Sequence, residues 1–161
     1  MITLVIARHA KSDWGDPGLA DHDRPLGARG LRDAPVMAAR LAGTGFRPAE
    51  ILSSTALRAR TTAGFFADVL GAPLRLDEGL YGAPGARLLA AAAATGHRSV
   101  MVVGHDPGMT VLADRLSGGG IGAMPTCAVA TFVWDADDWD VATALDPTRW
   151  TIDTPRGVTE G

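Results

Sequence analysis

The sequence predicts an α/β fold, a three-layer α/β/α sandwich around a mostly parallel sheet with an antiparallel C-terminal strand or hairpin. Short apolar runs rich in β-branched residues alternate with longer segments that have helical spacing. This alternation is typical of parallel sheets that are covered by helices. Residues 2–7 and 99–103 are apolar at nearly every position, which favours strands buried on both faces.

Helical spacing, together with glycine and proline, places the remaining elements. Leu31, Ala34, Ala38 and Leu41 recur as one face of a helix, which we expect Pro35 to start or kink. The polar residues before this helix indicate a loop. The other expected elements are, in chain order, a strand at 50–54, a helix at 57–70, an extended segment at 73–76, a helix at 87–95 and a helix from 107 to about 116.

The C-terminal part of the chain predicts a hairpin and a tail. Residues 128–134 and 139–144 are typical of two strands around a turn, so we expect an antiparallel hairpin there. The length of 161 residues suits one domain, which we place at residues 1–150, followed by a loose tail at residues 151–161. The sequence fits a monomer as well as a dimer.

Composition and charge exclude several classes of protein. Apolar residues make up 47% of the chain and charged residues 20%, the proportions of a globular domain rather than of a disordered or coiled-coil chain. The formal net charge is −3. Because the chain has no overall attraction for polyanions, we expect neither nucleic acid nor a membrane as a partner. A small anion would need a local cluster of positive groups.

Cysteine and histidine usage indicates a reducing compartment and no metal site. Cys127 is the single cysteine, so no internal disulfide can form. The four histidines have no HxxxH spacing, and we expect neither a metal ion nor a cofactor. No apolar run approaches the roughly 20 residues of a membrane span. We therefore expect a cytoplasmic protein.

Chemically distinctive residues follow three of the predicted strands. Because the carboxyl ends of parallel strands meet at one edge of a sheet, we expect these side chains to converge. The convergence would bring two arginines and two histidines around one anion site. The residues are, strand by strand, Arg8 and His9, then Ser53, Ser54 and Arg58, then His105 and Asp106.

This set of side chains is suited to phosphoryl transfer. Guanidinium groups match phosphate oxygens and stabilise their charge. A neutral imidazole can attack phosphorus and pass the phosphoryl group to water, while a carboxylic acid protonates the leaving group. A histidine in such a site can act as a proton shuttle or as the nucleophile. A nucleophilic imidazole must be neutral, and we expect the anion site to raise its pKa, so that activity falls as the pH drops below that raised pKa.

Three segments resemble the motifs of the histidine phosphatase superfamily, which includes the cofactor-dependent phosphoglycerate mutases. Residues 8–15 read RHAKSDWG against the family pattern RHGxSxWN, and residues 54–63 read STALRARTTA against SxxxRAxxTA. A later strand ends in a second histidine, His105. Within the superfamily, the short SixA-type phosphohistidine phosphatases are most similar, sharing the loop at 23–26 and the turn at 104–108.

The resemblance implies the roles of the site residues. It implies that His9 is the phosphorylated nucleophile and that Arg8, Arg58 and His105 hold the phosphoryl group. In the mutases an asparagine that contacts phosphate stands where this chain has Gly15, which weakens a mutase function. Further candidates, for a rim that binds substrate, are Lys11, Ser12 and Arg24.

The resemblance leaves two candidates for the general acid. Residues 76–82 read LDEGLYG and resemble the mutase segment LNExxYG, whose glutamate is the acid, so Glu78 is favoured. Asp106 is its rival, because the acid-phosphatase branch uses an aspartate directly after its second histidine. A phosphohistidine leaving group needs little help from either acid.

Three functions are compatible with these observations. The first is a metal-independent phosphatase with a phosphohistidine intermediate, acting on phosphohistidine in a protein. The second has the same chemistry but takes a small phosphomonoester, and the third is a phosphate-binding module without turnover. The short chain leaves little room for a lid over the site. An open site suits a phosphate on a protein surface, which favours the first function.

Overall fold

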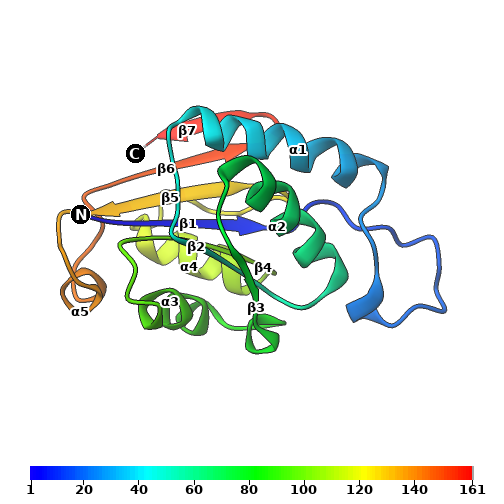
Figure 1. Cartoon of the computed structure of the whole chain (residues 1–161), viewed down its shortest axis with the longest axis horizontal. Coiled ribbons are helices and arrows are strands. Elements are labelled where there is room, and N and C mark those ends of the chain that lie inside the picture. The colour runs from blue at the N-terminus through cyan, green and yellow to red at the C-terminus, as the bar shows by residue number, and fades with distance from the viewer. Residues whose placement is uncertain (161) are drawn as a thin grey trace.

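A seven-stranded mixed sheet lies between two layers of helices in the computed structural model, which describes residues 1–160 (Figure 1). The strands are β1 (Ile2–Arg8), β2 (Glu50–Ser53), β3 (Leu74–Leu76), β4 (Ser99–Gly104), β5 (Val129–Trp134), β6 (Arg149–Thr154) and β7 (Gly157–Glu160). The helices are α1 (Ala28–Gly43), α2 (Leu57–Leu70), α3 (Gly85–Ala94), α4 (Gly108–Leu116) and α5 (Trp139–Thr143), with single 3-10 turns at Asp21–Asp23 and Glu78–Leu80. Within residues 1–160, no helix is long and apolar enough to cross a lipid bilayer.

The order of the strands makes one part of the sheet parallel and the other antiparallel. The order is β3-β2-β4-β1-β5-β6-β7, in which β1 to β4 run parallel and β5 to β7 pair antiparallel. Arg8 at the end of β1 lies opposite Gly104 of β4, and Ser53 at the end of β2 lies opposite Val103. The three strands therefore end at one edge of the sheet, and the predicted α/β fold is confirmed.

Side chains of the central strand alternate between two cores. Leu4 and Ile6 of β1 pack in the core that the sheet shares with α3, α4 and α5. Val5 and Ala7 pack in the core on the opposite face, which includes α1 and α2. All four side chains are fully buried. Burial on both faces explains the unbroken apolar sequence of β1 and fixes the place where the strand ends.

The loop after β1 is held against the first turn of α1. The Gly27 N–H donates to the Lys11 carbonyl at 2.9 Å. A Cβ atom at Gly30 would lie 2.2 Å from the same carbonyl oxygen, so only glycine permits this approach. The helix begins at Ala28 and runs through Pro35, so the expectation that Pro35 starts the helix is wrong.

The prediction that residues 139–144 form the second strand of a terminal hairpin is wrong, because this segment forms α5. Asp138 caps the helix by accepting a hydrogen bond from the Val141 N–H at 2.9 Å. Trp139 and Ala142 pack into the core from one face of the helix. Their spacing of three is a helical period, which in so short a segment resembles a strand pattern. β6 takes the expected position beside β5.

The C-terminal residues belong to the sheet. Residues 151–160, expected to form a loose tail, make most of β6 and all of β7. Ile152 is buried, and Arg40 of α1 donates to the carboxylate of Asp153 at 3.1 Å. The alternation of apolar and polar residues along β6 is the strand signal that the sequence carries. Residue 161, the last of the expected tail, lies outside the described residues.

Replacing Gly30 by alanine is expected to lower the free energy of unfolding by about 1–3 kcal/mol, because the new methyl group would force the loop away from α1. Gly43→Ala in the same helix is the matched control, since no other segment among residues 1–160 lies within 4 Å of its Cβ position. We expect this control to be neutral or stabilising by up to about 1 kcal/mol. Urea denaturation measures both variants, and equal stabilities would contradict the close approach.

Candidate functional site

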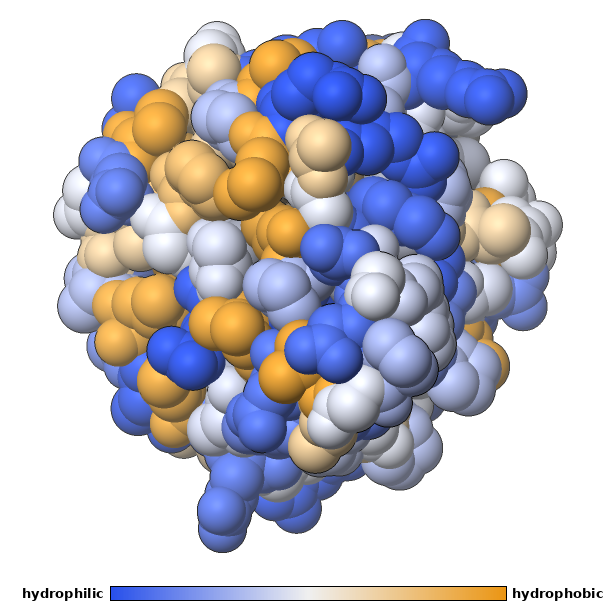
Figure 2. All heavy atoms as spheres, turned by 90° about the vertical axis from the view of Figure 1, so that its right-hand side faces the viewer, coloured by the Kyte–Doolittle hydropathy of each residue, from blue (hydrophilic) through white to orange (hydrophobic). Residues whose placement is uncertain are grey.

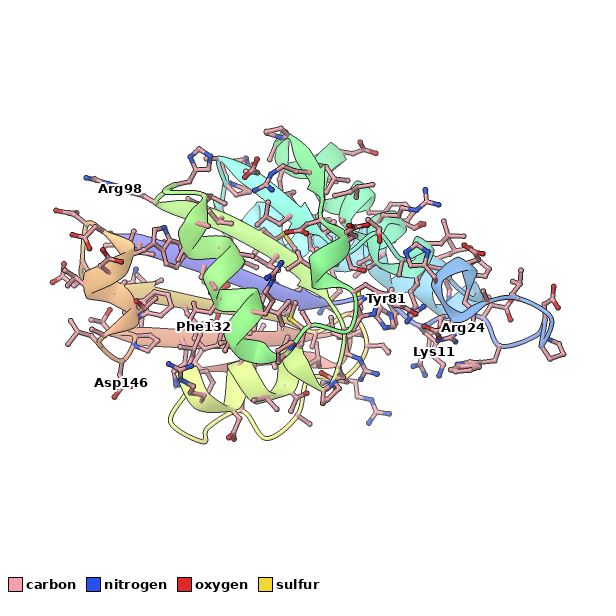
Figure 3. The ribbon with its side chains drawn as sticks, turned by 90° about the horizontal axis from the view of Figure 1, so that it is seen from below. Lys11, Arg24, Tyr81, Arg98, Phe132 and Asp146 are labelled. Carbon is pink, nitrogen blue, oxygen red and sulfur yellow. The ribbon has the colours of Figure 1, made fainter. Side chains whose placement is uncertain are left out.

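A pocket of about 280 Å³ opens at the edge where β1, β2 and β4 end. Figure 2 looks onto this end of the molecule, where hydrophilic side chains form a broad region. Lys11, Arg24 and Tyr81 gather at this end, whereas Arg98 and Asp146 lie at the opposite end (Figure 3). The pocket is lined by Arg8, His9, Lys11, Ser12, Trp14, Arg24, Arg58, His105, Asp106 and Thr126.

The fold brings together nearly every residue that the sequence predicts for the site. The two arginines and two histidines of the strand ends line the pocket, as do Asp106 and the rim candidates Lys11, Ser12 and Arg24. Glu78 does not line it and is exposed on a 3-10 turn. The geometry therefore gives no support to the preference for Glu78 over Asp106 as the general acid.

His9 is held by hydrogen bonds on both sides of its backbone. Its N–H donates to the Gly104 carbonyl at 3.0 Å, and its carbonyl accepts from the Cys127 N–H at 3.1 Å. The ring nitrogen Nδ1 lies 2.7 Å from the Ala10 carbonyl oxygen. Because a carbonyl only accepts, Nδ1 carries the ring proton. Nε2 then keeps a free lone pair, which is the state that an attacking imidazole needs.

Thr62 links the turn that carries His9 to the helix that carries Arg58. The Thr62 hydroxyl accepts from the Ala10 N–H at 3.0 Å and donates to the Arg58 carbonyl at 2.8 Å. Sequence reasoning assigned Thr62 no role. The available signal is its position four residues after Arg58 on α2, which places the two residues on one face of the helix.

Burial lowers the pKa of His9 to about 4, and the charges of Arg58 and Arg8 act in the same direction. The hydrogen bond to Ala10 opposes this shift. The ring is thus neutral down to acidic pH. The expectation that the site raises the pKa of His9 is therefore wrong. The ring is buried and surrounded by cations, which disfavour its charged form.

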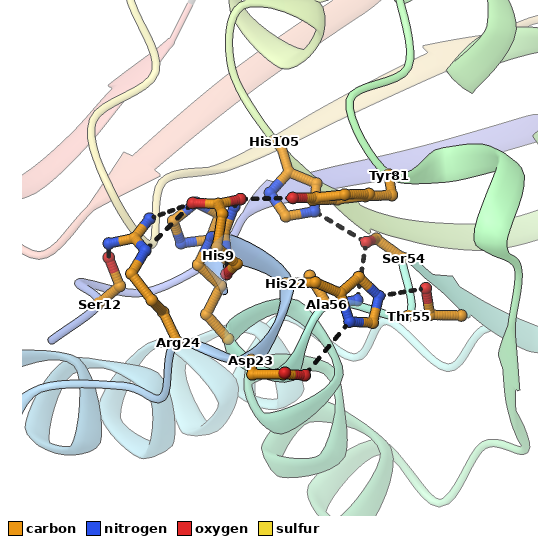
Figure 4. Close-up of polar contacts among 12 residues, drawn as sticks. His9, Ser12, His22, Asp23, Arg24, Ser54, Thr55, Ala56, Tyr81 and His105 are labelled. Carbon is orange, nitrogen blue, oxygen red and sulfur yellow. Dashed lines mark hydrogen bonds and ion pairs between the residues drawn. The ribbon is translucent and has the colours of Figure 1, made fainter. Parts of the chain in front are cut away.

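His105 lies beside His9, with the ring centroids 5.1 Å apart, and contacts Ser54 (Figure 4). The Ser54 hydroxyl accepts from the Ala56 N–H at 3.1 Å and lies 2.8 Å from Nε2 of His105. Within residues 1–160, Nε2 is the one acceptor for the hydroxyl proton, so Nδ1 carries the proton of the ring. Burial, followed by the charges of His9 and Arg58, lowers the pKa of His105 to about 3. His105 is therefore a neutral donor.

A hydrogen bond and an ion pair hold the side chain of Arg8 in position. Its NH1 group donates to the Met124 carbonyl at 3.1 Å and lies 3.4 Å from the carboxylate of Asp106. The Thr110 hydroxyl donates to Asp106 at 2.9 Å and accepts from the Met124 N–H at 3.0 Å. Asp106 thus forms an ion pair with Arg8 and accepts hydrogen bonds from Thr110 in the first turn of α4.

Arg58 is buried and paired with Asp21. Its NH1 group donates to the Asp21 carbonyl at 2.7 Å, and NH2 donates to the carboxylate at 2.9 Å. Tyr81 and Arg24 donate to the same carboxylate. The hydrogen bond from Tyr81, followed by those from Arg58 and Arg24, lowers the pKa of Asp21 far below its usual value. Sequence reasoning missed Asp21 and Tyr81 as site residues.

Three nitrogens of the pocket residues are buried without a hydrogen-bond partner in the described part of the chain. They are Nε of Arg8, Nε of Arg58 and Nδ1 of His105. A buried donor without an acceptor costs about 1–3 kcal/mol. Independently of these atoms, Arg8, Arg58 and His105 line the same pocket as His9, so their side chains surround the space that an oxyanion would occupy. The arrangement can therefore bind a tetrahedral oxyanion and attack it with a neutral imidazole.

The mouth of the pocket carries an aromatic ring. Trp14 is 68% exposed, and the guanidinium of Arg24 lies 3.4 Å from its ring centroid. Arg24 also donates to Ser12 Oγ at 2.8 Å (Figure 4). The ring offers a surface against which a substrate can pack. Among residues 1–160, no group of three or more His, Cys, Asp or Glu side chains could hold a metal ion.

Comparisons with known proteins agree with this geometry. A family model described as the histidine phosphatase superfamily (branch 1) matches residues 4–82. An uncharacterized chloroplastic protein from Arabidopsis thaliana is 32% identical, over 93% of this chain and 75% of the relative.

Two solved structures of SixA proteins are also similar to this chain. One, provisionally assigned as the phosphohistidine phosphatase SixA from Agrobacterium tumefaciens, is 32% identical with a TM-score of 0.77 and covers 83% of this chain and 92% of its own. Another, the protein histidine phosphatase SixA complexed with tungstate, is 24% identical with a TM-score of 0.71 and covers 99% of this chain and 94% of its own. At that identity the second structure supports the fold alone.

Titration of the ligand-free protein is expected to show His9 losing its proton with a midpoint near pH 4. Protonation of His9 then removes activity only as the pH falls toward 4, because burial and the neighbouring arginines disfavour the charged ring. Imidazole NMR signals recorded against pH measure the midpoint, and the spectrum of His9→Gln assigns it. A midpoint at or above 6.5 would contradict the neutral ring.

Ser54→Ala is expected to change the tautomer of His105 and to lower kcat/KM for an aryl phosphate by about 10-fold, the equivalent of one hydrogen bond. Nitrogen-15 shifts of the ring report the tautomer directly. Ser53→Ala is the matched control, because this buried hydroxyl donates to the Ser54 carbonyl and not to the ring. Unchanged His105 shifts in Ser54→Ala would refute the assignment.

Proposed function

The chain belongs to the histidine phosphatase superfamily as a SixA-type phosphatase, and from this membership we propose that it removes the phosphoryl group from phosphohistidine on a protein. In this proposal His9 attacks phosphorus, while Arg8, Arg58 and His105 hold the phosphoryl oxygens. The observation that carries it is the convergence of Arg8, Arg58 and His105 on one pocket with a His9 whose Nε2 is unprotonated. We also propose a cytoplasmic location, on the ground of the single cysteine.

The first step transfers the phosphoryl group to the protein. Nε2 of His9 forms a bond to phosphorus in line with the leaving group, as the P–N bond to the substrate imidazole breaks. A substrate ring that carries a proton on its other nitrogen leaves as neutral imidazole. The ring of His9 becomes cationic in this step, and the hydrogen bond from its Nδ1–H to the Ala10 carbonyl stabilises that charge.

The second step returns the protein to its starting state. Water attacks phosphorus and gives its proton to solvent, while the P–N bond to His9 breaks and releases inorganic phosphate. His9 keeps its proton on Nδ1 throughout. N–H donors from Arg8, Arg58 and His105 stabilise the charge on the transferred oxygens in both steps.

The demand for a general acid favours phosphohistidine over a phosphomonoester. An alkoxide leaving group needs a proton from an acid, whereas neutral imidazole leaves without one. Within residues 1–160, Asp106 is the one carboxylate of the pocket lining, and it already accepts from Thr110 and contacts Arg8. The 32% identical structure assigned as a phosphohistidine phosphatase supports the same substrate.

Trapping the intermediate tests the nucleophile. A brief reaction with a phosphohistidine protein labelled on phosphorus is expected to leave an acid-labile, base-stable phosphoryl group on His9, because a phosphoimidazole hydrolyses in acid. His9→Ala is expected to abolish both the label and phosphate release. His97→Ala serves as the control, since His97 is exposed and outside the pocket. A label on another residue would overturn the mechanism, and turnover of small phosphomonoesters alone would favour the second function.

Substitution of the two acids tests the leaving-group argument. Glu78→Gln is expected to change kcat on phosphohistidine by less than about 2-fold, the range of substitutions on an exposed surface. Asp106→Asn is expected to lower kcat/KM by about 10-fold for phosphohistidine and alkyl phosphates alike, because it loosens Arg8. Steady-state kinetics with both substrates make the comparison. A loss confined to the alkyl phosphates would instead identify Asp106 as a general acid.

A further inference from the structure

We propose that a groove next to the phosphate pocket is a second anion-binding subsite, which holds an acidic side chain of the phosphoprotein near its phosphorylated residue. The inference rests on the proposed function and specifies its substrate class. The groove has a volume of about 380 Å³, and its lining includes Arg29, Asp33, Thr126, Pro155 and Arg156.

Thr126 joins the groove to the phosphate pocket, because it lines both. Arg29 donates to the Thr126 hydroxyl at 3.2 Å, so its guanidinium lies directly beside this junction. A peptide with its phosphoryl group at His9 can therefore cross Thr126 and place a neighbouring side chain in the groove.

The groove carries more positive than negative charge. Arg29 lies 4.0 Å from Asp33, a distance that leaves its guanidinium free for other acceptors. The side chain of Arg156 has no hydrogen-bond or ion-pair partner among the residues that the structure describes. The whole chain has a net charge of −3, so this positive groove is not a general property of the surface. Such local complementarity selects an anionic partner.

The backbone that presents Arg156 is fixed in place. Arg156 lies in the turn between β6 and β7, where its N–H donates to the Thr154 hydroxyl at 3.1 Å. The same hydroxyl donates to the Gly157 carbonyl at 3.2 Å. Arg40 of α1 donates to the Thr154 carbonyl at 2.9 Å and ties the turn to the helix layer. Because the turn is already fixed, only the side chain of Arg156, and not its backbone, loses freedom when an anion binds.

A carboxylate on a protein chain is the ligand that these features fit. Guanidinium groups bind carboxylates through paired hydrogen bonds. The pocket and the groove together form an elongated basic surface with Thr126 in its middle. An extended peptide can occupy both parts at once, with a phosphorylated residue in one and a glutamate or aspartate in the other.

Peptide binding tests the subsite without requiring turnover. Fluorescent phosphohistidine peptides with a glutamate one to four positions from the phosphorylated residue are compared with glutamine peptides by anisotropy. All proteins carry His9→Asn, which removes the nucleophile and preserves the label. We expect the glutamate peptide to bind about 2- to 5-fold more tightly at one or more positions, the range for exposed ion pairs. High salt should reduce that preference.

Charge reversal locates the preference. Arg156→Glu is expected to abolish the difference between the glutamate and glutamine peptides, measured on that same variant. Arg98→Glu, at the opposite end of the molecule (Figure 3), is expected to keep it. The proposed subsite would be contradicted if the glutamate peptides bound no more tightly than the glutamine peptides at any position. It would also be contradicted if Arg156→Glu and Arg98→Glu reduced that preference equally. A third contradicting result would be a small bisphosphate whose affinity depends on Arg156, together with peptides whose affinity does not. A failure of the proposed function would be distinguishable from a failure of the subsite. In that case the unmodified chain would release no phosphate from the peptide.

Discussion

The parallel pairing of β1 with β4 is the constraint on which the site depends. Arg8 pairs with Gly104 at the strand ends, and the His9 N–H continues the pairing by donating to the Gly104 carbonyl. His9 and His105 therefore leave the sheet at the same level, with their rings side by side. A slip of one residue would send each side chain of β1 to the opposite face of the sheet. Leu4 and Ile6 pack in one core and the smaller Val5 and Ala7 in the other, so a slip would misfit both cores, and close packing also positions the chemistry.

Around these strand ends, uncharged hydrogen-bond partners decide where protons lie. The Ala10 carbonyl keeps the proton of His9 on Nδ1, and Ser54 directs that of His105 to Nδ1 as well. Thr62 holds Ala10 in place from α2. Neighbouring histidines both remain neutral because burial and cations oppose a charge on either ring. One ring is thus set up as an acceptor of phosphorus and the other as a donor to oxygen.

Local patterns predict the strand ends, and long-range contacts explain what they miss. Apolar runs followed at once by Arg8, His9 and His105 reveal the edge of the sheet, since the sequence changes from apolar to charged or polar within one residue. Asp21 lies in a polar loop without periodicity, and its partner Arg58 is 37 residues away. No local signal reports such a pair. Glu78 illustrates the opposite case, in which a local motif is present but points to the wrong residue. The segment that resembles the motif brings Tyr81, and not Glu78, near His105.

The pairing of Arg58 with Asp21 has a consequence for how anions leave. Two of the guanidinium nitrogens already donate to Asp21 of the same chain, one to its backbone carbonyl and the other to its carboxylate. An oxyanion that binds both NH groups of Arg58 would have to compete with Asp21. Because Asp21 is part of the same chain, its effective concentration far exceeds that of free phosphate in solution. A phosphate in the pocket therefore meets an Arg58 with fewer free donors than an unpaired guanidinium would offer.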